Sequence, residues 1–150
     1  MGAYDRKLRE GAEPFLDEGE EVLAAFIARP RGWTQSIAGA RNLGRVQVNE
    51  NSRDAASVGF ALASPMALAI TQRRLITLSI GSPIGMGIGG KVKGIAGSAP
   101  LAAVDSIEIQ RLAVGKVVTV TIGGEPFKLE ANAAADAKGL VAAFENAKTQ

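Results

Sequence analysis

Apolar and polar residues alternate through much of the second half of the chain. Within residues 105–111, Ile107 and Ile109 share one face and polar side chains occupy the other, which is the pattern of a half-buried antiparallel strand. The same period of two returns in residues 117–122, and a Gly-Gly pair then precedes a further strand that begins at residues 127–129. Because two glycines suit a tight hairpin turn, we expect three consecutive strands joined as a meander.

Two earlier strands are predicted on either side of the polar pair at residues 72–73. Residues 67–71 and 74–80 are mostly apolar, and the pair between them fits the turn of a hairpin. The second strand alternates, so its two faces differ. We expect its core face to be formed by Ile76, Leu78 and Ile80.

The remaining strand signals are weaker. Residues 21–29 form an apolar run that ends at Pro30, which predicts a first strand, while the frequent alanines leave a helix open as the alternative. Residues 81–90 are rich in glycine and are expected to form a loop, followed by a glycine-weakened strand at residues 92–98.

Helical spacing marks both ends of the chain. In residues 3–17 the apolar positions of the expected helix are Tyr4, Leu8, Ala12, Phe15 and Leu16. Gly11 and Pro14 are expected to shorten or break it. At the other end Asn132 can cap a helix over residues 133–148. Its apolar stripe contains Ala137, Leu140, Val141, Phe144 and Ala147, and we expect this stripe to cover the open end of a curled sheet.

The stretch from residue 33 to residue 65 is the least regular part of the sequence. Small residues and glycines interrupt it, and only a weak helical spacing is present. Because a structureless connection of this length is unusual in a domain, we expect a partly helical insertion or a functional loop. For residues 55–69 there is an alternative, an apolar helix that packs internally or against another copy of the chain.

Composition narrows the class of protein. The 150 residues are 47% hydrophobic, and one domain spanning residues 1–150 is the default for this length. The sequence has no cysteine, which excludes a disulfide framework and thiolate metal sites, and residues 1–21 are acidic rather than signal-like. We therefore expect a cytoplasmic protein. Residues 29–93 hold nine Lys or Arg and two Asp or Glu, a net charge of +7, so the middle of the chain is its basic part.

The lack of histidine as well as cysteine also limits the chemistry. The commonest general base and the strongest nucleophile are missing, so we expect no catalytic residue, no metal site and no cofactor. Residues 85–90 match the dinucleotide pattern G-x-G-x-x-G, and residues 85–91 match the start of a P-loop. However, Val92 stands where a P-loop needs Ser or Thr, and the next residues do not resemble a helix. We interpret this segment as a loop between strands.

Three stretches together suggest a family. Residues 68–78 contain an apolar-Thr-x-x-Arg-apolar hairpin, residues 99–108 contain a Pro-Leu pair followed by a strand, and the hairpin at residues 117–129 precedes an alanine-rich helix. With Glu20 and Glu21 before the first strand, this order resembles the bacterial pleckstrin-homology-like (PH-like) family, which is related to PH and GRAM-type domains.

The resemblance implies a mainly β fold with helices (α+β). It would be a PH-like antiparallel β-barrel or sandwich capped by a C-terminal α-helix at about residues 133–148, with an N-terminal helix at about residues 3–17 and an insertion at about residues 33–65. Residues 37–65 depart from the family pattern. The family implies a non-catalytic binding module and names no ligand.

Two sets of residues are candidates for binding. Flexible glycines beside Lys91 and Lys93 can wrap a phosphate or an anionic headgroup. The other cations of this candidate anion site are Arg29, Arg31, Arg73 and Arg74. If four or more cations converge, each contributes about 1 kcal/mol of attraction to an anionic membrane surface. The candidate contacts for a protein partner are Trp33, Arg41, Arg45 and Phe60.

Two functional hypotheses result. The first is a PH-like module that recognises a protein or peptide partner, or another copy of itself, through a sheet edge or the insertion. The alternative is peripheral binding of an anionic lipid or another phosphate-bearing ligand, which would place the protein at a membrane surface. No feature of the sequence points to specific nucleic-acid binding.

Overall fold

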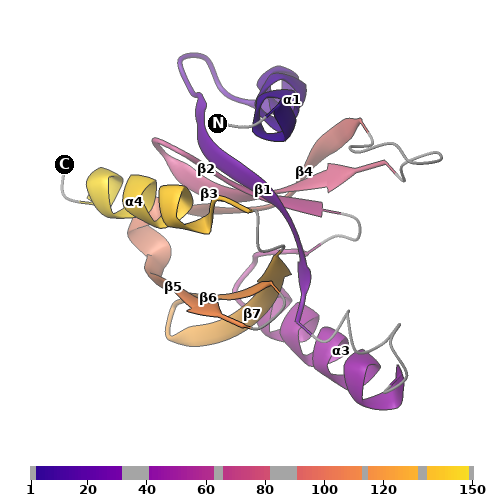
Figure 1. Ribbon diagram of the computed structural model, residues 1–150. Coiled ribbons are helices and arrows are strands. Elements are labelled where there is room, and N and C mark those ends of the chain that lie inside the picture. The colour runs from indigo at the N-terminus through magenta and orange to yellow at the C-terminus, as the bar shows by residue number, and fades with distance from the viewer. Residues whose placement is uncertain are drawn as a thin grey trace.

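In the part of the chain that the computed structural model describes, seven antiparallel strands form one continuous sheet (Figure 1). The structure describes residues 3–31, 41–62, 66–81, 91–112, 115–131 and 135–148. The strands are β1 (Val22–Pro30), β2 (Met66–Thr71), β3 (Arg74–Ile80), β4 (Val92–Pro100), β5 (Val104–Arg111), β6 (Lys116–Ile122) and β7 (Glu125–Ala131). Their order in the sheet is β4-β3-β2-β1-β7-β6-β5, so β4 and β5, which are consecutive in sequence, form its two edges.

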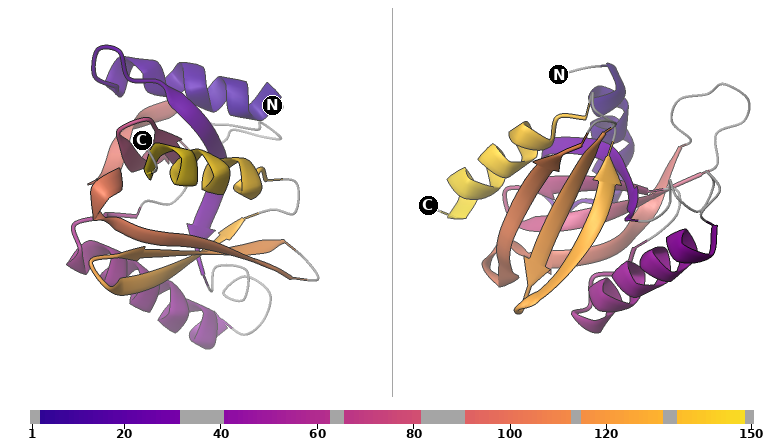
Figure 2. Two further views of the ribbon diagram at one scale, coloured as in Figure 1. Left: turned by 90° about the vertical axis from the view of Figure 1, so that its left-hand side faces the viewer. Right: turned by 60° about the horizontal axis from the view of Figure 1, so that its bottom comes forward.

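Among the residues that the structure describes, three α-helices surround this sheet (Figure 2). The helices are α1 (Ala3–Ala12), α3 (Arg41–Ser57) and α4 (Ala137–Lys148), and two short 3-10 helices are η1 (Glu13–Phe15) and η2 (Leu101–Ala103). Helix α1 packs on β1 and β4, α3 packs on β7 and β1, and α4 packs on β1, β2, β5 and η2. In the described part of the chain, no helix is long and apolar enough to cross a membrane.

The predicted strands are confirmed. The β2–β3 hairpin and the β5-β6-β7 meander pair in antiparallel register, as does the first strand, for which a helix was the alternative. Gly123 and Gly124 have φ values of 59° and 81°, which is the left-handed pair that a two-residue hairpin turn requires. The glycine-weakened strand is β4, whose pairing with β3 shifts register twice.

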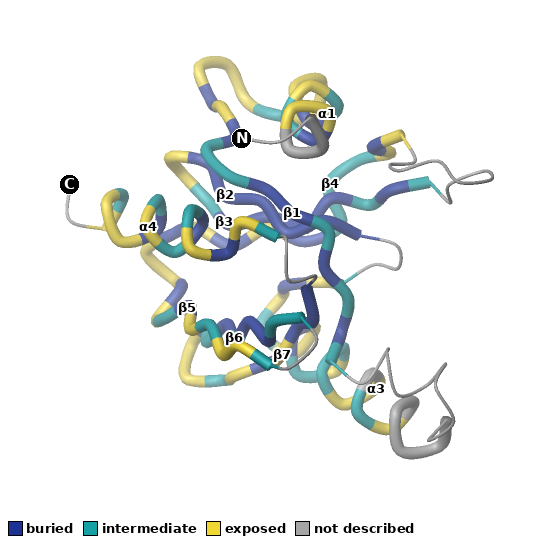
Figure 3. Tube along the Cα trace, in the orientation of Figure 1, coloured by how far each residue is buried: buried dark blue, intermediate teal, exposed yellow. Residues whose placement is uncertain are grey.

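The sheet has a core on each side of its first half. The larger core lies between the strands and α4, and it contains Phe26, Leu75, Phe127, Leu140 and Phe144 among others. A smaller core lies under α1. Because both faces of this half of the sheet are covered, β2 and most of β3 are buried along their length (Figure 3).

The buried face predicted for β3 is confirmed, but it faces the second core. Ile76, Leu78 and Ile80 are buried, but they pack under α1 rather than in the larger core, which Leu75 on the opposite face enters. The alternation of β3 showed two faces, yet it could not show that α1 would cover one of them.

The larger core confirms the expected role of the C-terminal helix. The sheet does not close by hydrogen bonds, since β4 and β5 are not paired. Helix α4 lies across the open end, where Leu140 is fully buried and Phe144 is 5% exposed. The fold is therefore PH-like, a strongly curled antiparallel sheet capped by a C-terminal helix, as the resemblance implied.

The helix boundaries differ from the prediction. Helix α1 ends at Ala12 and continues as η1, which contains Pro14, so the expected break is confirmed. Helix α4 begins at Ala137 rather than at residue 133, and the Asp136 carboxylate accepts a hydrogen bond from the Gly139 N–H as its cap. Asn132, the predicted cap, lies outside the described residues.

Part of the predicted insertion is helical, as expected. Helix α3 ends at Ser57 and strand β2 begins at Met66, so the alternative of one apolar helix over residues 55–69 is wrong. Asn51 attaches α3 to the sheet, since its amide donates to the Arg31 carbonyl at 3.2 Å and accepts from the Lys128 N–H at 2.8 Å. This amide ties α3 to the end of β1 and to β7.

Candidate functional site

One free edge of the sheet is formed by β5. Within the described residues this strand pairs only with β6, in a regular register from Ser106 to Arg111. An edge strand presents unpaired backbone N–H and C=O groups that can accept another strand. The edge is therefore a potential binding surface made by the backbone itself.

The hairpin turn determines which β5 groups are free. Leu112 donates its N–H to the Gly115 carbonyl at 3.0 Å, so these residues form a hydrogen-bonded pair. Hydrogen-bonded and non-hydrogen-bonded pairs alternate along an antiparallel ladder. Counting back through the register, Ile107, Ile109 and Arg111 fall in non-hydrogen-bonded pairs. Their N–H and C=O groups therefore point away from β6, toward the open edge.

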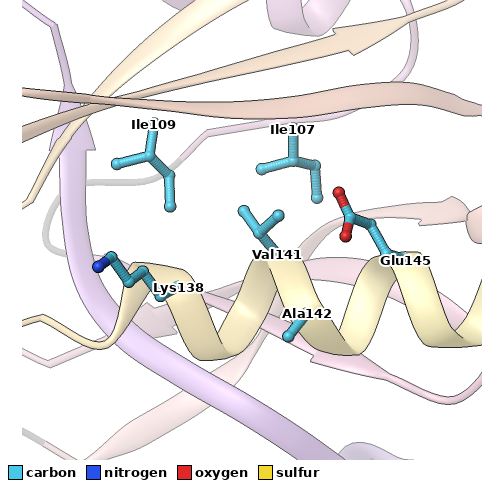
Figure 4. Close-up of a pocket in the computed structure, with 6 residues that line it drawn as sticks. All are labelled: Ile107, Ile109, Lys138, Val141, Ala142 and Glu145. Carbon is cyan, nitrogen blue, oxygen red and sulfur yellow. The ribbon is translucent and has the colours of Figure 1, made fainter.

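A groove accompanies this edge between β5 and α4 (Figure 4). Its volume is about 250 Å³, and it is lined by Ile107, Ile109, Lys138, Val141, Ala142 and Glu145. Val141 points toward the two isoleucines, while Lys138 lies toward Ile109 and Glu145 toward Ile107. The groove is thus apolar along its middle and carries one charge of each sign at its rim.

The groove and the edge share the same residues. Ile107 and Ile109 contribute side chains to the groove and free backbone groups to the edge. A strand added to β5 would place every second side chain over the groove, because side chains in a strand alternate between faces. The arrangement can hold an extended chain by its backbone and by alternate side chains at once.

The predicted anion site is divided between separate places. Arg74 lies at the β2–β3 turn, where its guanidinium donates to both oxygens of Glu20 at 2.9 Å. Thr71 also donates to that carboxylate at 2.7 Å, and the Glu20 side chain is fully buried. The hydrogen bonds from Arg74 lower the pKa of Glu20 from 4.5 to about 2, against the opposing effect of burial. Arg74 is therefore engaged in a structural ion pair.

The other cations of that set do not converge on Arg74. Arg73 is exposed beside Arg74. Lys91 and Lys93 are exposed at the opposite end of β3, which is about 20 Å from Arg74 because six strand residues of about 3.3 Å each separate the two ends. Arg31 forms an ion pair of 3.1 Å with Glu130, and Arg29 lies opposite Glu130 in the β1–β7 register. The structure brings together Arg29 with Arg31 and Lys91 with Lys93, but not all six.

The predicted partner contacts differ in outcome. Phe60 is fully buried and stacks on Phe127 with a centroid separation of 5.6 Å, so its prediction as a surface contact is wrong. No local sequence pattern indicates that a large aromatic residue in an irregular segment will be buried in the core. Arg41 and Arg45 belong to α3, but their side chains lie outside the described part, as does Trp33.

The glycine motif at residues 85–90 also lies outside the described residues. Beyond the motif, the chain passes through Lys91 and enters strand β4 at Val92. A phosphate-binding loop of either type needs a helix at that position. The strand therefore excludes a P-loop or a dinucleotide-binding loop at these glycines.

Comparison with solved structures finds bacterial pleckstrin-homology domains. One is a DUF1696 family protein with a pleckstrin-homology domain from Shewanella loihica, with 14% sequence identity, a TM-score of 0.47, and coverage of 94% of this chain and 93% of that chain. Another is a pleckstrin homology domain from Shewanella amazonensis, with 15% identity, a TM-score of 0.47, and coverage of 92% of each chain. No family model and no curated protein matches the sequence.

These likenesses are remote, and the PH-like fold is established by the strand order and α4 of the chain itself. The sites predicted from sequence do not include the β5–α4 groove, although Ile107, Ile109 and Val141 are all predicted as apolar positions of their elements. Helical spacing puts Val141 at the margin of its stripe, and this position was the available signal that its side chain is only half-buried. What could not be foreseen is that β5 would be an edge strand next to α4.

Proposed function

We propose that this protein is a non-catalytic binding module that takes an extended peptide segment of a partner protein along β5. The observation that carries the proposal is the coincidence of a free strand edge with an apolar groove on the same two residues, Ile107 and Ile109. Addition of a strand to a sheet edge is a general mode of peptide recognition, in which backbone hydrogen bonds supply affinity and alternate side chains supply specificity.

The other edge of the sheet is less suited to this role. Strand β4 shifts register against β3 at two places, and such irregularities blunt an edge. The chain after α3 also crosses the face of β4, since the Ala61 carbonyl lies only 2.5 Å from where a Cβ on Gly97 would be. Strand β5 has neither feature between Ser106 and Arg111.

Selection of random displayed heptapeptides on the full chain tests the proposal. Selected peptides are expected to lose at least tenfold in affinity, measured by fluorescence anisotropy, when Val141→Lys places a charge in the groove. The matched control is Val46→Lys, the same change on an exposed residue of α3, which should leave binding intact. Equal loss in both variants, or no loss in either, contradicts the proposed site.

A change in the peptide provides a second test that does not depend on the folding of a variant. A selected peptide is methylated in turn at each backbone nitrogen, which removes one donor at a time. If the peptide adds to β5, affinity falls at every second position only, because alternate residues of an added strand bond to the edge. A uniform effect, or none, rules out strand addition. A stable dimer in light scattering that Val141→Lys converts to a monomer would assign the edge to a second copy instead.

A further inference from the structure

Charges of opposite sign stand at the two ends of the groove. At one end, α4 presents Lys138 beside Ile109. Arg111 ends β5 two residues beyond Ile109, so the alternation of the strand directs its side chain to the same face as Ile109. At the other end, α4 presents Glu145 beside Ile107. Asp105 precedes Ile107 in β5, at the register irregularity between Val104 and Ser106. All four charged residues are exposed, but the Asp105 carboxylate accepts a hydrogen bond from the Gly124 N–H at 2.8 Å. The charge that this end of the groove offers to a ligand therefore comes chiefly from Glu145. The groove is therefore positive at one end and negative at the other.

The spacing of these charges matches a short extended segment. Lys138 and Glu145 are seven residues apart on a helix, about 10 Å along its axis at 1.5 Å per residue. Three steps of a strand cover about the same length. Between the charges there is room for an apolar-x-apolar unit, whose two apolar side chains would lie opposite Ile109 and Ile107.

The edge also sets the direction of such a segment if it pairs antiparallel to β5, as every neighbouring pair in this sheet does. Its N-terminal end then lies beside Arg111 and Lys138, and its C-terminal end lies beside Asp105 and Glu145. Like charges placed opposite each other across a ladder are unfavourable, and opposite charges are favourable.

We infer that the β5–α4 groove selects peptides whose charges are ordered, with acidic residues before an apolar-x-apolar unit and basic residues after it. This inference depends on the proposed function, because it specifies the ligand of the same site. The partner class it names is a protein with an exposed extended segment of this charge order. Electrostatic complementarity of this kind mainly determines specificity and register.

Two synthetic peptides of identical composition test the charge order. The forward peptide is Glu-Glu-Val-Thr-Val-Lys-Lys, and the reversed peptide is Lys-Lys-Val-Thr-Val-Glu-Glu, each with blocked ends and a fluorophore. For the full chain at low salt, the forward peptide is expected to bind about tenfold more tightly by anisotropy, since exposed charge pairs contribute modestly each. High salt should reduce the difference, because exposed charges are screened.

Exchanging the charges on the protein gives the decisive comparison. In the double variant Lys138→Glu with Glu145→Lys the preference should invert or vanish, while Val46→Lys should keep it. If both peptides bind the wild type equally and both are lost in Val141→Lys, the charge-order inference is wrong and the proposed function stands. If neither peptide binds at low salt, both are wrong.

Discussion

Removal of Arg74 offers a quantitative test of the network that anchors the N-terminal segment to the sheet. In Arg74→Gln, the buried Glu20 carboxylate keeps its hydrogen bonds from Thr71 and the Asp17 N–H but loses its charged partner. Breaking a buried ion pair on one side leaves an uncompensated charge, which costs about 3–5 kcal/mol. We therefore expect the free energy of unfolding at pH 7 to fall by about that amount.

The pKa of Glu20 gives an independent value for the same effect. Its folded pKa is lowered from 4.5 to about 2, and each unit corresponds to about 1.4 kcal/mol, so the ion pair and its hydrogen bonds contribute roughly 3 kcal/mol at pH 7. Because the folded pKa is the lower one, this contribution is complete above about pH 4.5. It is lost as the pH falls toward 2, and about half remains at pH 3.

Urea unfolding of the wild type and Arg74→Gln between pH 7 and pH 3 measures both quantities. The difference in unfolding free energy between the two proteins should be largest at pH 7 and should shrink by about half at pH 3. Arg73→Gln is the matched control, since Arg73 is exposed and its guanidinium donates a long hydrogen bond of 3.4 Å to the Glu18 carbonyl. A difference that does not change with pH would refute the assignment of this stability to Glu20 ionisation.

Three other predictions concern separate parts of the molecule. Asn51→Ala should lower the free energy of unfolding in urea by about 2–3 kcal/mol, because it removes the side-chain amide that joins α3 to the sheet. Gly11→Ala should lower the free energy of unfolding by about 1–3 kcal/mol, because its Cβ would lie 2.8 Å from Val92 Cγ2. In a double-mutant cycle the same change should cost less in a Val92→Ala background. The double variant Lys91→Glu with Lys93→Glu should bind the forward peptide with unchanged affinity in anisotropy. Lys93 lies in β4 and Lys91 just before it, at the edge of the sheet opposite β5. A tenfold loss of affinity would indicate that the peptide binds at the β4 edge.

Much of the fold could be predicted because local signals agreed with the final packing. Period-two alternation located β5 and β6, and the glycines at 123–124 specified the turn before β7. The Thr71-x-x-Arg74 spacing marked a hairpin for a physical reason, since Thr71 accepts from the N–H groups of Arg73 and Arg74 while Arg74 reaches Glu20. That motif is therefore a structural one, which the sequence alone could not distinguish from an anion site.

The failures arose where the decisive contact is long-range. Phe60 is in an irregular segment, and only the approach of Phe127 from β7 makes it part of the core. The second face of β3 is buried because α1, more than 60 residues earlier in the chain, covers it. The groove depends on the strand order, which leaves β5 at an edge beside α4, and no local pattern encodes that order.

Amide hydrogen exchange of the full chain, with and without the forward peptide, tests strand addition at β5 most directly. The account predicts slower exchange at the Ile107, Ile109 and Arg111 amides, which face the open edge, by about tenfold or more at saturating peptide. The amides of Glu108 and Gln110, already directed at β6, should change little. Protection confined to β4, or spread evenly along β5 without this alternation, would contradict strand addition at β5.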